Sequence, residues 1–268
     1  MWIDSHAHLD CFIDEGDLPD MLTRARASGV TGVIAIGGSD EANDKALAAA
    51  REHEDVCAVL GYDRDEADRA PAVGGLEALL SDPAVVGVGE TGLDYHYSAE
   101  TASQQCALLE HMLDLACACR LPVVIHTRDA EADTHRLLAR YAARWNGPRD
   151  VPGVIHCYTG DGPFARSLMD LGFMISFSGI VTFKKADALR EVARIVPDDL
   201  LLVETDAPYL APVPYRGKRN EPAYVPHVGA AVAAVRGQTP EEVARMTTAN
   251  VRRLFGNWPA APDEEATS

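Results

Sequence analysis

Two histidines separated by one residue stand close to the start of the chain, in the segment Asp4-Ser5-His6-Ala7-His8. Side chains alternate between the two faces of a β-strand, so a strand here would point His6 and His8 the same way. Two imidazoles held side by side can bind one divalent ion, and imidazole nitrogen suits transition metals such as zinc and iron. The pair alone is a weak signal, because two hydrogen-bonded or solvated histidines have the same spacing.

Four more side chains of metal-ligating type stand at or just after the ends of other apolar runs. They are Glu90, His126, His156 and Asp206. Chance places one or two polar groups at such ends. Four histidines and two carboxylates, far apart in the sequence, instead predict one site built from the ends of several strands.

Eight short apolar runs recur along the chain and predict the strands that carry these residues. The runs cover residues 2–4, 32–36, 56–60, 85–89, 122–125, 153–155, 173–177 and 200–203. Nearly continuous apolar runs of this length are typical of parallel strands buried on both faces. Stretches with helical spacing lie between the runs, and the clearest are residues 17–28, 107–119, 130–145 and 186–195.

Alternating strands and helices without a break in composition predict an α/β protein, a single (β/α)8 TIM-type barrel over residues 1–257. A doubly wound open sheet is the alternative, but no glycine-rich phosphate loop follows the first run. Thr239 and Pro240 begin the last helix, as its N-cap and first helical residue. Residues 258–268 are acidic and predict a flexible tail.

The composition limits the classes of protein to which the chain can belong. The 268 residues include 24 Lys and Arg and 41 Asp and Glu, a net charge of −17. Such a surface argues against a passive nucleic-acid binder, which needs a basic face, but does not exclude an enzyme that meets phosphate through bound metal. The six cysteines form no CxxC pair and predict reduced thiols in a cytoplasmic protein. No apolar run is long enough to predict a membrane span or a signal peptide.

Barrel geometry sorts the six candidate ligands into two groups. The first and eighth strands are neighbours in a closed barrel, so His6, His8 and Asp206 can share one ion. The fifth and sixth strands are also neighbours, so His126 and His156 can share another. Glu90, on the fourth strand, has two oxygens and can bridge the two ions.

Two divalent ions about 3.5–4 Å apart form the usual two-metal hydrolytic site. We therefore expect two ions per chain, whether zinc (Zn), manganese (Mn) or magnesium (Mg). Glu90 and Asp206 are the expected catalytic carboxylates, and Asp206 can accept the proton of the attacking water.

Further residues near these ends are candidates for supporting roles. Arg128 and Arg216 are positioned to clamp the oxygens of a substrate phosphate. For Arg216, and for the cations at 218 and 219, an ordinary solvated loop is an equally good interpretation. Asp4 and Glu204 each precede a candidate ligand by two residues, so we expect them on the same face but deeper, orienting imidazoles or water.

The residues around these candidates also carry a family resemblance. The matching segments are DSHAHL (4–9), GETGLDY (89–95), PVVIH (122–126), HCYTG (156–160), ISFSG (175–179), ETDAPYL (204–210) and RGKRNEP (216–222). With these segments the chain resembles the TatD family of metal-dependent hydrolases, often described as deoxyribonucleases. The resemblance implies a TIM-type barrel, a two-metal site with the same six ligands, and hydrolysis of phosphodiester bonds in DNA.

One segment departs from the family pattern. After the third strand such proteins usually carry Gly-x-His-Pro-His, whereas this chain has Gly61-Tyr62-Asp63-Arg64-Asp65. Asp63 would repel a phosphate unless Arg64 or a metal compensates.

The leading hypothesis is a DNA phosphodiesterase that acts as an exonuclease, with DNA or another phosphodiester at the metal site, no membrane contact and no obligate protein partner. The first alternative is an amidohydrolase-type deacylase or lactonase on the same barrel. Such sites often bridge their metals with a modified lysine, and Glu90 occupies that place here. The second alternative, a non-catalytic binding protein, predicts missing ligands, and none of the six is missing.

Overall fold

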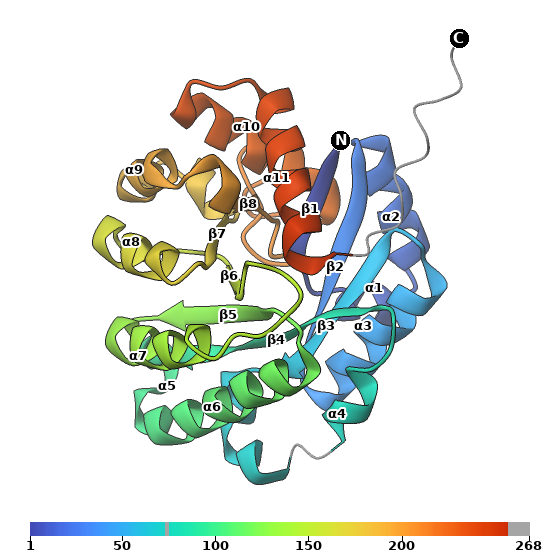
Figure 1. Ribbon diagram of the computed structural model, residues 1–268. Coiled ribbons are helices and arrows are strands. Elements are labelled where there is room, and N and C mark those ends of the chain that lie inside the picture. The colour runs from blue at the N-terminus through green and yellow to red at the C-terminus, as the bar shows by residue number, and fades with distance from the viewer. Residues whose placement is uncertain (73–74, 257–268) are drawn as a thin grey trace.

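The computed structural model describes residues 1–72 and 75–256 and has one sheet of eight parallel strands in the order β1 to β8 (Figure 1). The strands are β1 (Trp2–Ala7), β2 (Val30–Gly38), β3 (Val56–Tyr62), β4 (Val85–Asp94), β5 (Val123–Arg128), β6 (Gly153–Ile155), β7 (Met174–Phe177) and β8 (Leu201–Val203). A bridge between Ala7 and Ala207 brings the segment after β8 beside the end of β1 and nearly closes the barrel. The predicted (β/α)8 barrel is confirmed.

Helices surround the sheet on its outer side (Figure 1). The α-helices are α1 (Asp10–Asp14), α2 (Leu18–Ala27), α3 (Asp40–Glu52), α4 (Leu76–Leu79), α5 (Tyr95–Ser98), α6 (Ala102–Cys119), α7 (Glu131–Ala142), α8 (Gly162–Asp170), α9 (Asp187–Ile195), α10 (Val225–Arg236) and α11 (Pro240–Phe255). No helix in this part of the chain combines the length and the apolar character that a membrane crossing requires. The acidic tail expected at 258–268 lies outside the described residues, and the domain boundary at 257 stays a prediction.

Helix α6 begins at Ala102, five residues before the start that its apolar pattern predicts. The extra turn is polar, and its Gln105 is fully buried. The side-chain amide of Gln105 accepts from the Asp94 amide at 2.8 Å and donates to the Ser98 carbonyl at 2.8 Å. A helical turn buried through hydrogen bonds leaves no apolar periodicity, so the sequence pattern missed it.

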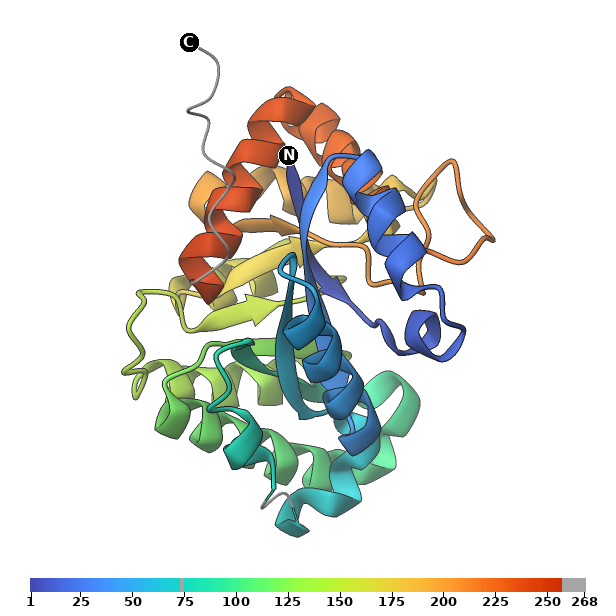
Figure 2. The same ribbon diagram turned by 90° about the vertical axis from the view of Figure 1, so that its right-hand side faces the viewer.

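Helix α11 closes the amino-terminal end of the barrel. Its Val251, Leu254 and Phe255 belong to the same buried cluster as the side chains inside the barrel. Asn250 donates to the carbonyl of Leu201, the first residue of β8, at 2.9 Å. In Figure 2 the red helix α11 and the orange loop after β8 lie on opposite sides of the barrel. The carboxyl-terminal end of the barrel is therefore the one left open for a site.

Asn43 of α3 ties the ends of two strands together at that open rim. Its side-chain amide donates to the Gly61 carbonyl at 2.9 Å and accepts from the amides of Gly61 and Gly38 at 3.0 and 3.3 Å. Asn43 is 1% exposed, so water cannot replace these bonds. A Cβ on Gly37 would lie 1.9 Å from Asn43 Oδ1, which explains the glycine there.

We expect Asn43→Ala to lower the free energy of unfolding by about 2–4 kcal/mol, because it leaves buried amide groups of β2 and β3 without partners. Urea denaturation followed by circular dichroism measures the loss. Asp44→Ala, at an exposed position of the same helix, is the matched control and should change stability by less than about 0.5 kcal/mol. Equal stability of the two variants would show that Asn43 does not hold the rim.

Candidate metal centre

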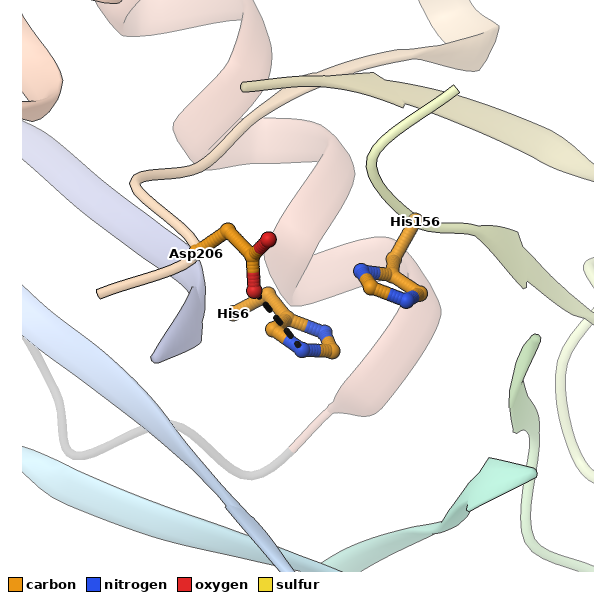
Figure 3. A group of neighbouring side chains, drawn as sticks. All are labelled: His6, His156 and Asp206. Carbon is orange, nitrogen blue, oxygen red and sulfur yellow. Dashed lines mark ion pairs between the residues drawn. The ribbon is translucent and has the colours of Figure 1, made fainter. Parts of the chain in front are cut away.

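The structure brings all six predicted ligands together at the open end of the barrel. His6 and His8 come from the end of β1, Glu90 and His126 from β4 and β5, and His156 and Asp206 from the segments that follow β6 and β8. Their ligand atoms form three overlapping groups within which all atoms lie inside 4.8 Å of one another. Figure 3 shows one group, in which His6, His156 and Asp206 reach the same place from three separate segments.

The first half of the site is made by His6, His8, Asp206 and one oxygen of Glu90. The two imidazole Nε2 atoms lie 3.3 Å apart. Glu90 Oε2 is 3.4 Å from His6 Nε2 and 3.5 Å from His8 Nε2. Asp206 Oδ1 is 3.8 and 3.7 Å from the same two nitrogens. Four ligand atoms therefore surround one point.

The second half uses the other oxygen of Glu90. Its Oε1 lies 3.5 Å from His126 Nδ1 and 3.1 Å from His156 Nε2. Glu90 thus presents one oxygen to each pair of histidines, as a carboxylate shared by two ions would. The side chain of Glu90 is nearly buried between the two pairs.

The residues present fit divalent cations. His156 Nε2 is buried and has no hydrogen-bond partner among the described residues, although Glu90 is close. Buried polar atoms without partners are rare because they cost free energy, and a cation would satisfy this one. The rings of His6 and His156 are stacked at 3.8 Å, and burial together with His156 lowers the pKa of His6 to about 4. A neutral imidazole is the form that binds a metal.

The two carboxylates of the site differ in their electrostatics. Burial alone would raise the pKa of Glu90, but the neighbouring imidazoles of His156, His6 and His8 outweigh burial and hold it well below its usual value. Burial raises the pKa of Asp206 to about 7, with Glu204 and Glu90 acting in the same direction. Glu90 is therefore the carboxylate that stays charged between the histidines.

Two further carboxylates orient the histidines. Glu204 Oε1 lies 3.3 Å from His156 Nδ1 and accepts from the Cys157 amide at 2.7 Å. Asp94 Oδ2 lies 2.9 Å from His126 Nε2. Burial alone would raise the pKa of Asp94, but the bond from His126, the Tyr97 amide and the charge of Arg64 together lower it to about 2. A carboxylate on the far nitrogen fixes the tautomer and the ring orientation of a ligating histidine.

Sequence reasoning missed Asp94, although a signal was present. Asp94 stands four residues after Glu90, and both belong to β4. An even spacing on a strand puts two side chains on the same face. The predicted strand ended at residue 89, so this relation was not visible.

Asp4 has different contacts from those expected. Its Oδ1 accepts from the Thr205 amide at 2.8 Å and from the His6 amide at 3.3 Å, and its Oδ2 accepts from the Thr205 hydroxyl. It contacts backbone and hydroxyl rather than an imidazole ring. These bonds tie β1 to the segment that carries Asp206, so Asp4 positions two of the ligands through the backbone.

A cavity of about 400 Å³ opens over the candidate metal centre. Asp63, Arg64 and Tyr209 line it together with five of the six candidate ligands, His8, Glu90, His126, His156 and Asp206. Arg128 and Arg216 are not among its described lining residues. The Arg128 guanidinium lies 4.9 Å from the ring centre of Tyr97, and that of Arg216 lies 3.6 Å from the ring centre of Phe183. Their role as substrate contacts stays a prediction.

A TIM-type barrel whose open rim gathers four histidines and two carboxylates has the fold and site of a metal-dependent hydrolase. The family model described as TatD related DNase matches residues 3–256, and the chain belongs to this family.

Known relatives span almost the whole chain. The chain is 42% identical over 256 residues to the uncharacterized metal-dependent hydrolase YcfH of Escherichia coli K12, covering 94% of this chain and 95% of that protein. It is 35% identical over 248 residues to a Klebsiella pneumoniae protein named 3'-5' ssDNA/RNA exonuclease TatD, covering 90% of this chain and 92% of that protein. The crystal structure of YjjV, a TatD homolog from E. coli K12, superimposes with a TM-score of 0.87 at 30% identity, covering 95% and 97%.

We expect Asp94→Asn to weaken metal binding by roughly 10- to 100-fold, because the amide holds the His126 imidazole less firmly and in a less basic state. Isothermal titration of the metal-free protein with Zn²⁺ or Mn²⁺ measures the affinity. Asp133→Asn is the control, since Asp133 bonds the nearby Tyr95 hydroxyl at 3.0 Å and no histidine. Equal affinities of the two variants would contradict the orienting role of Asp94.

Proposed function

We propose that the protein is a two-metal hydrolase that cleaves phosphodiester bonds of DNA and releases nucleotides from a strand end. The observation that carries the proposal is Glu90, which presents one oxygen to His6 and His8 and the other to His126 and His156. One ion would be held by His6, His8 and Asp206, the other by His126 and His156, with Glu90 between them. The Klebsiella pneumoniae relative named as a 3'-5' ssDNA/RNA exonuclease supports the substrate class.

Divalent ions bound here would acidify water and neutralise charge on a phosphate. The chain's own residues supply the positioning. Asp206 lines the cavity beside His6 and His8, so its carboxylate can accept a proton from the attacking water. Glu204 and Asp94 hold His156 and His126 in orientation through the nitrogens that face away from Glu90.

The size of the cavity supports action on one nucleotide at a time. A volume of about 400 Å³ lies near the lower end of the range of small-molecule sites. Such a cavity holds a terminal nucleotide but not a duplex. The proposal therefore favours release of nucleotides from an end of a single strand over cleavage within a double helix.

A second candidate function is hydrolysis of an uncharged ester, lactone or amide. Asp63 lines the cavity and would repel an anion, whereas a neutral substrate meets no such repulsion. The same six residues serve either reaction, because water activation at two metals does not depend on the substrate's charge. A panel of phosphodiesters, lactones and acylated amines separates the two candidates.

We expect the purified protein with added Mn²⁺, Mg²⁺ or Zn²⁺ to release mononucleotides from single-stranded DNA. His126→Ala should lower kcat/KM by about 1,000-fold, which corresponds to several kcal/mol of lost transition-state stabilisation. His111→Ala, at an exposed position of α6, is the control and should retain full activity. Release of labelled nucleotides, separated by gel or chromatography, measures the rates.

Inert wild-type protein on DNA, RNA and model phosphodiesters would end the nuclease proposal. Turnover of lactones or acylated amines by the same preparation would then favour the second candidate. Nuclease activity that His126→Ala retains would point to a contaminating enzyme.

A further inference from the structure

We propose that Arg64 is the phosphate-binding residue of this cavity, a substrate-positioning group that grips an anionic substrate beside the metal ligands. The inference rests on the proposed phosphodiesterase function and names the residue that gives it selectivity for anions. Arg64 begins the turn that follows β3, next to Asp63.

Arg64 is the only arginine or lysine among the described residues that line the cavity. The same lining contains six carboxylates, from Asp10, Asp63, Asp65, Glu66, Glu90 and Asp206. A phosphate entering this space meets repulsion from those carboxylates that are ionised, although burial raises the pKa values of Asp63 and Asp206 to about 7. Apart from bound metal, Arg64 is the group on the described lining that can offset it.

The guanidinium of Arg64 lies close to two carboxylates but forms no hydrogen bond with a described residue. Its Nε is buried and has no hydrogen-bond partner among the described residues. The nearest carboxylate oxygens are Asp94 Oδ2, 3.6 Å from Nε, and Asp65 Oδ2, 3.8 Å from Nη2. Both distances exceed those of hydrogen bonds. For contrast, Arg24 donates to Glu221 at 2.8 Å and to Asp17 at 3.0 Å.

A guanidinium in this state suits a phosphate. It presents planar N–H donors that match two phosphate oxygens at once. The Arg64 side chain is 20% exposed, so much of its freedom is already lost before a ligand arrives. Gripping a phosphate costs Arg64 no existing hydrogen bond, because it has none to break among the described residues.

The amino end of α3 borders the same cavity but offers no alternative anion site. The Ala42 amide donates to Ser39 Oγ at 3.2 Å, and the Gly38 amide donates to Asn43. Asp40 and Glu41 occupy the first turn and add negative charge there. The Ala42 and Asn43 amides are therefore taken, the latter by the Ser39 carbonyl at 2.8 Å, and the two acids already offset the helix dipole.

A purely structural role for Arg64 would act through Asp94, since that carboxylate orients His126. Asp94 has other partners, however. It accepts from the His96 and Tyr97 amides, both at 3.0 Å, besides its 2.9 Å contact with His126. These bonds fix Asp94 without Arg64. If Arg64 binds phosphate, replacing it weakens substrate affinity. If it acts only through Asp94, replacing it weakens metal binding.

The experiment compares Arg64→Ala and Arg64→Lys with Arg51→Ala, an exposed arginine of α3 paired with Asp82 and remote from the cavity. For each variant we measure KM and kcat on a short single-stranded DNA, KM on p-nitrophenyl acetate, and bound metal per chain. Arg64→Ala should raise KM for DNA by about 10- to 100-fold, the usual worth of a charged hydrogen-bond pair. Arg64→Lys should give a KM for DNA between those of the wild type and Arg64→Ala. In both variants kcat on DNA, bound metal per chain and KM for p-nitrophenyl acetate should change less than about threefold.

Two outcomes would overturn the inference: a KM for DNA like that of Arg51→Ala, or loss of bound metal in Arg64→Ala. If Arg64→Ala does not fold, Arg64→Gln replaces it, and failure of both to fold would show a structural role and overturn the inference too.

If the wild type hydrolyses no phosphodiester, the proposed function fails separately. In that case, isothermal titration of the metal-loaded wild type and Arg64→Ala with thymidine 5'-monophosphate tests phosphate binding directly. Binding that is weakened in Arg64→Ala supports the phosphate site. Equal affinities, or no binding to the wild type, overturn it.

Discussion

The position of Glu90 between two pairs of histidines is the constraint on which the rest of the structure depends. Burying a carboxylate is costly unless opposite charge and hydrogen-bond donors surround it. Glu90 is 5% exposed, and its neighbours come from β1, β5 and the segment after β6. No local stretch of chain can supply such neighbours. Only a sheet that curves back on itself brings the first strand and the sixth to the two oxygens of one residue on the fourth. The barrel is the physical condition for a charged Glu90 and, through it, for the two-metal site proposed above.

Polar side chains around Glu90 keep its neighbours in position by linking the ends of adjacent segments. Asp4 links β1 to the segment of Asp206, and Asn43 links β2 to β3. Glu204 and Asp94 fix two imidazoles. At the other end, α11 fills the barrel with apolar side chains. One end of the same barrel is therefore stabilised by apolar burial, while the other is held together by hydrogen bonds of buried polar side chains.

The sequence allowed the eight strands and the grouping of six ligands to be predicted, for different reasons. Buried parallel strands leave continuous apolar runs, and the ligands follow those runs directly. Asp94 was missed because β4 continues past Glu90 through Gly92, so its apolar run ends before the strand does. Helix α6 was predicted too short because its first turn is buried through Gln105. The stacking of Arg128 on Tyr97 and of Arg216 on Phe183 depends on loop paths, which no local pattern records.

The charge of the molecule fits a site that works at short range. With a net charge of −17, the protein does not attract a polyanion from a distance. Repulsion between exposed charges fades beyond about 8 Å at physiological ionic strength, so a strand end can approach the rim. Inside the cavity screening is weaker, and under the proposed function Arg64 and bound metal would face the phosphate directly. Asp63 and its neighbouring acids would then disfavour any anion that does not contact those cations. Such a surface would disfavour binding along a nucleic acid and favour capture of its end, the mode that exonucleolytic release requires.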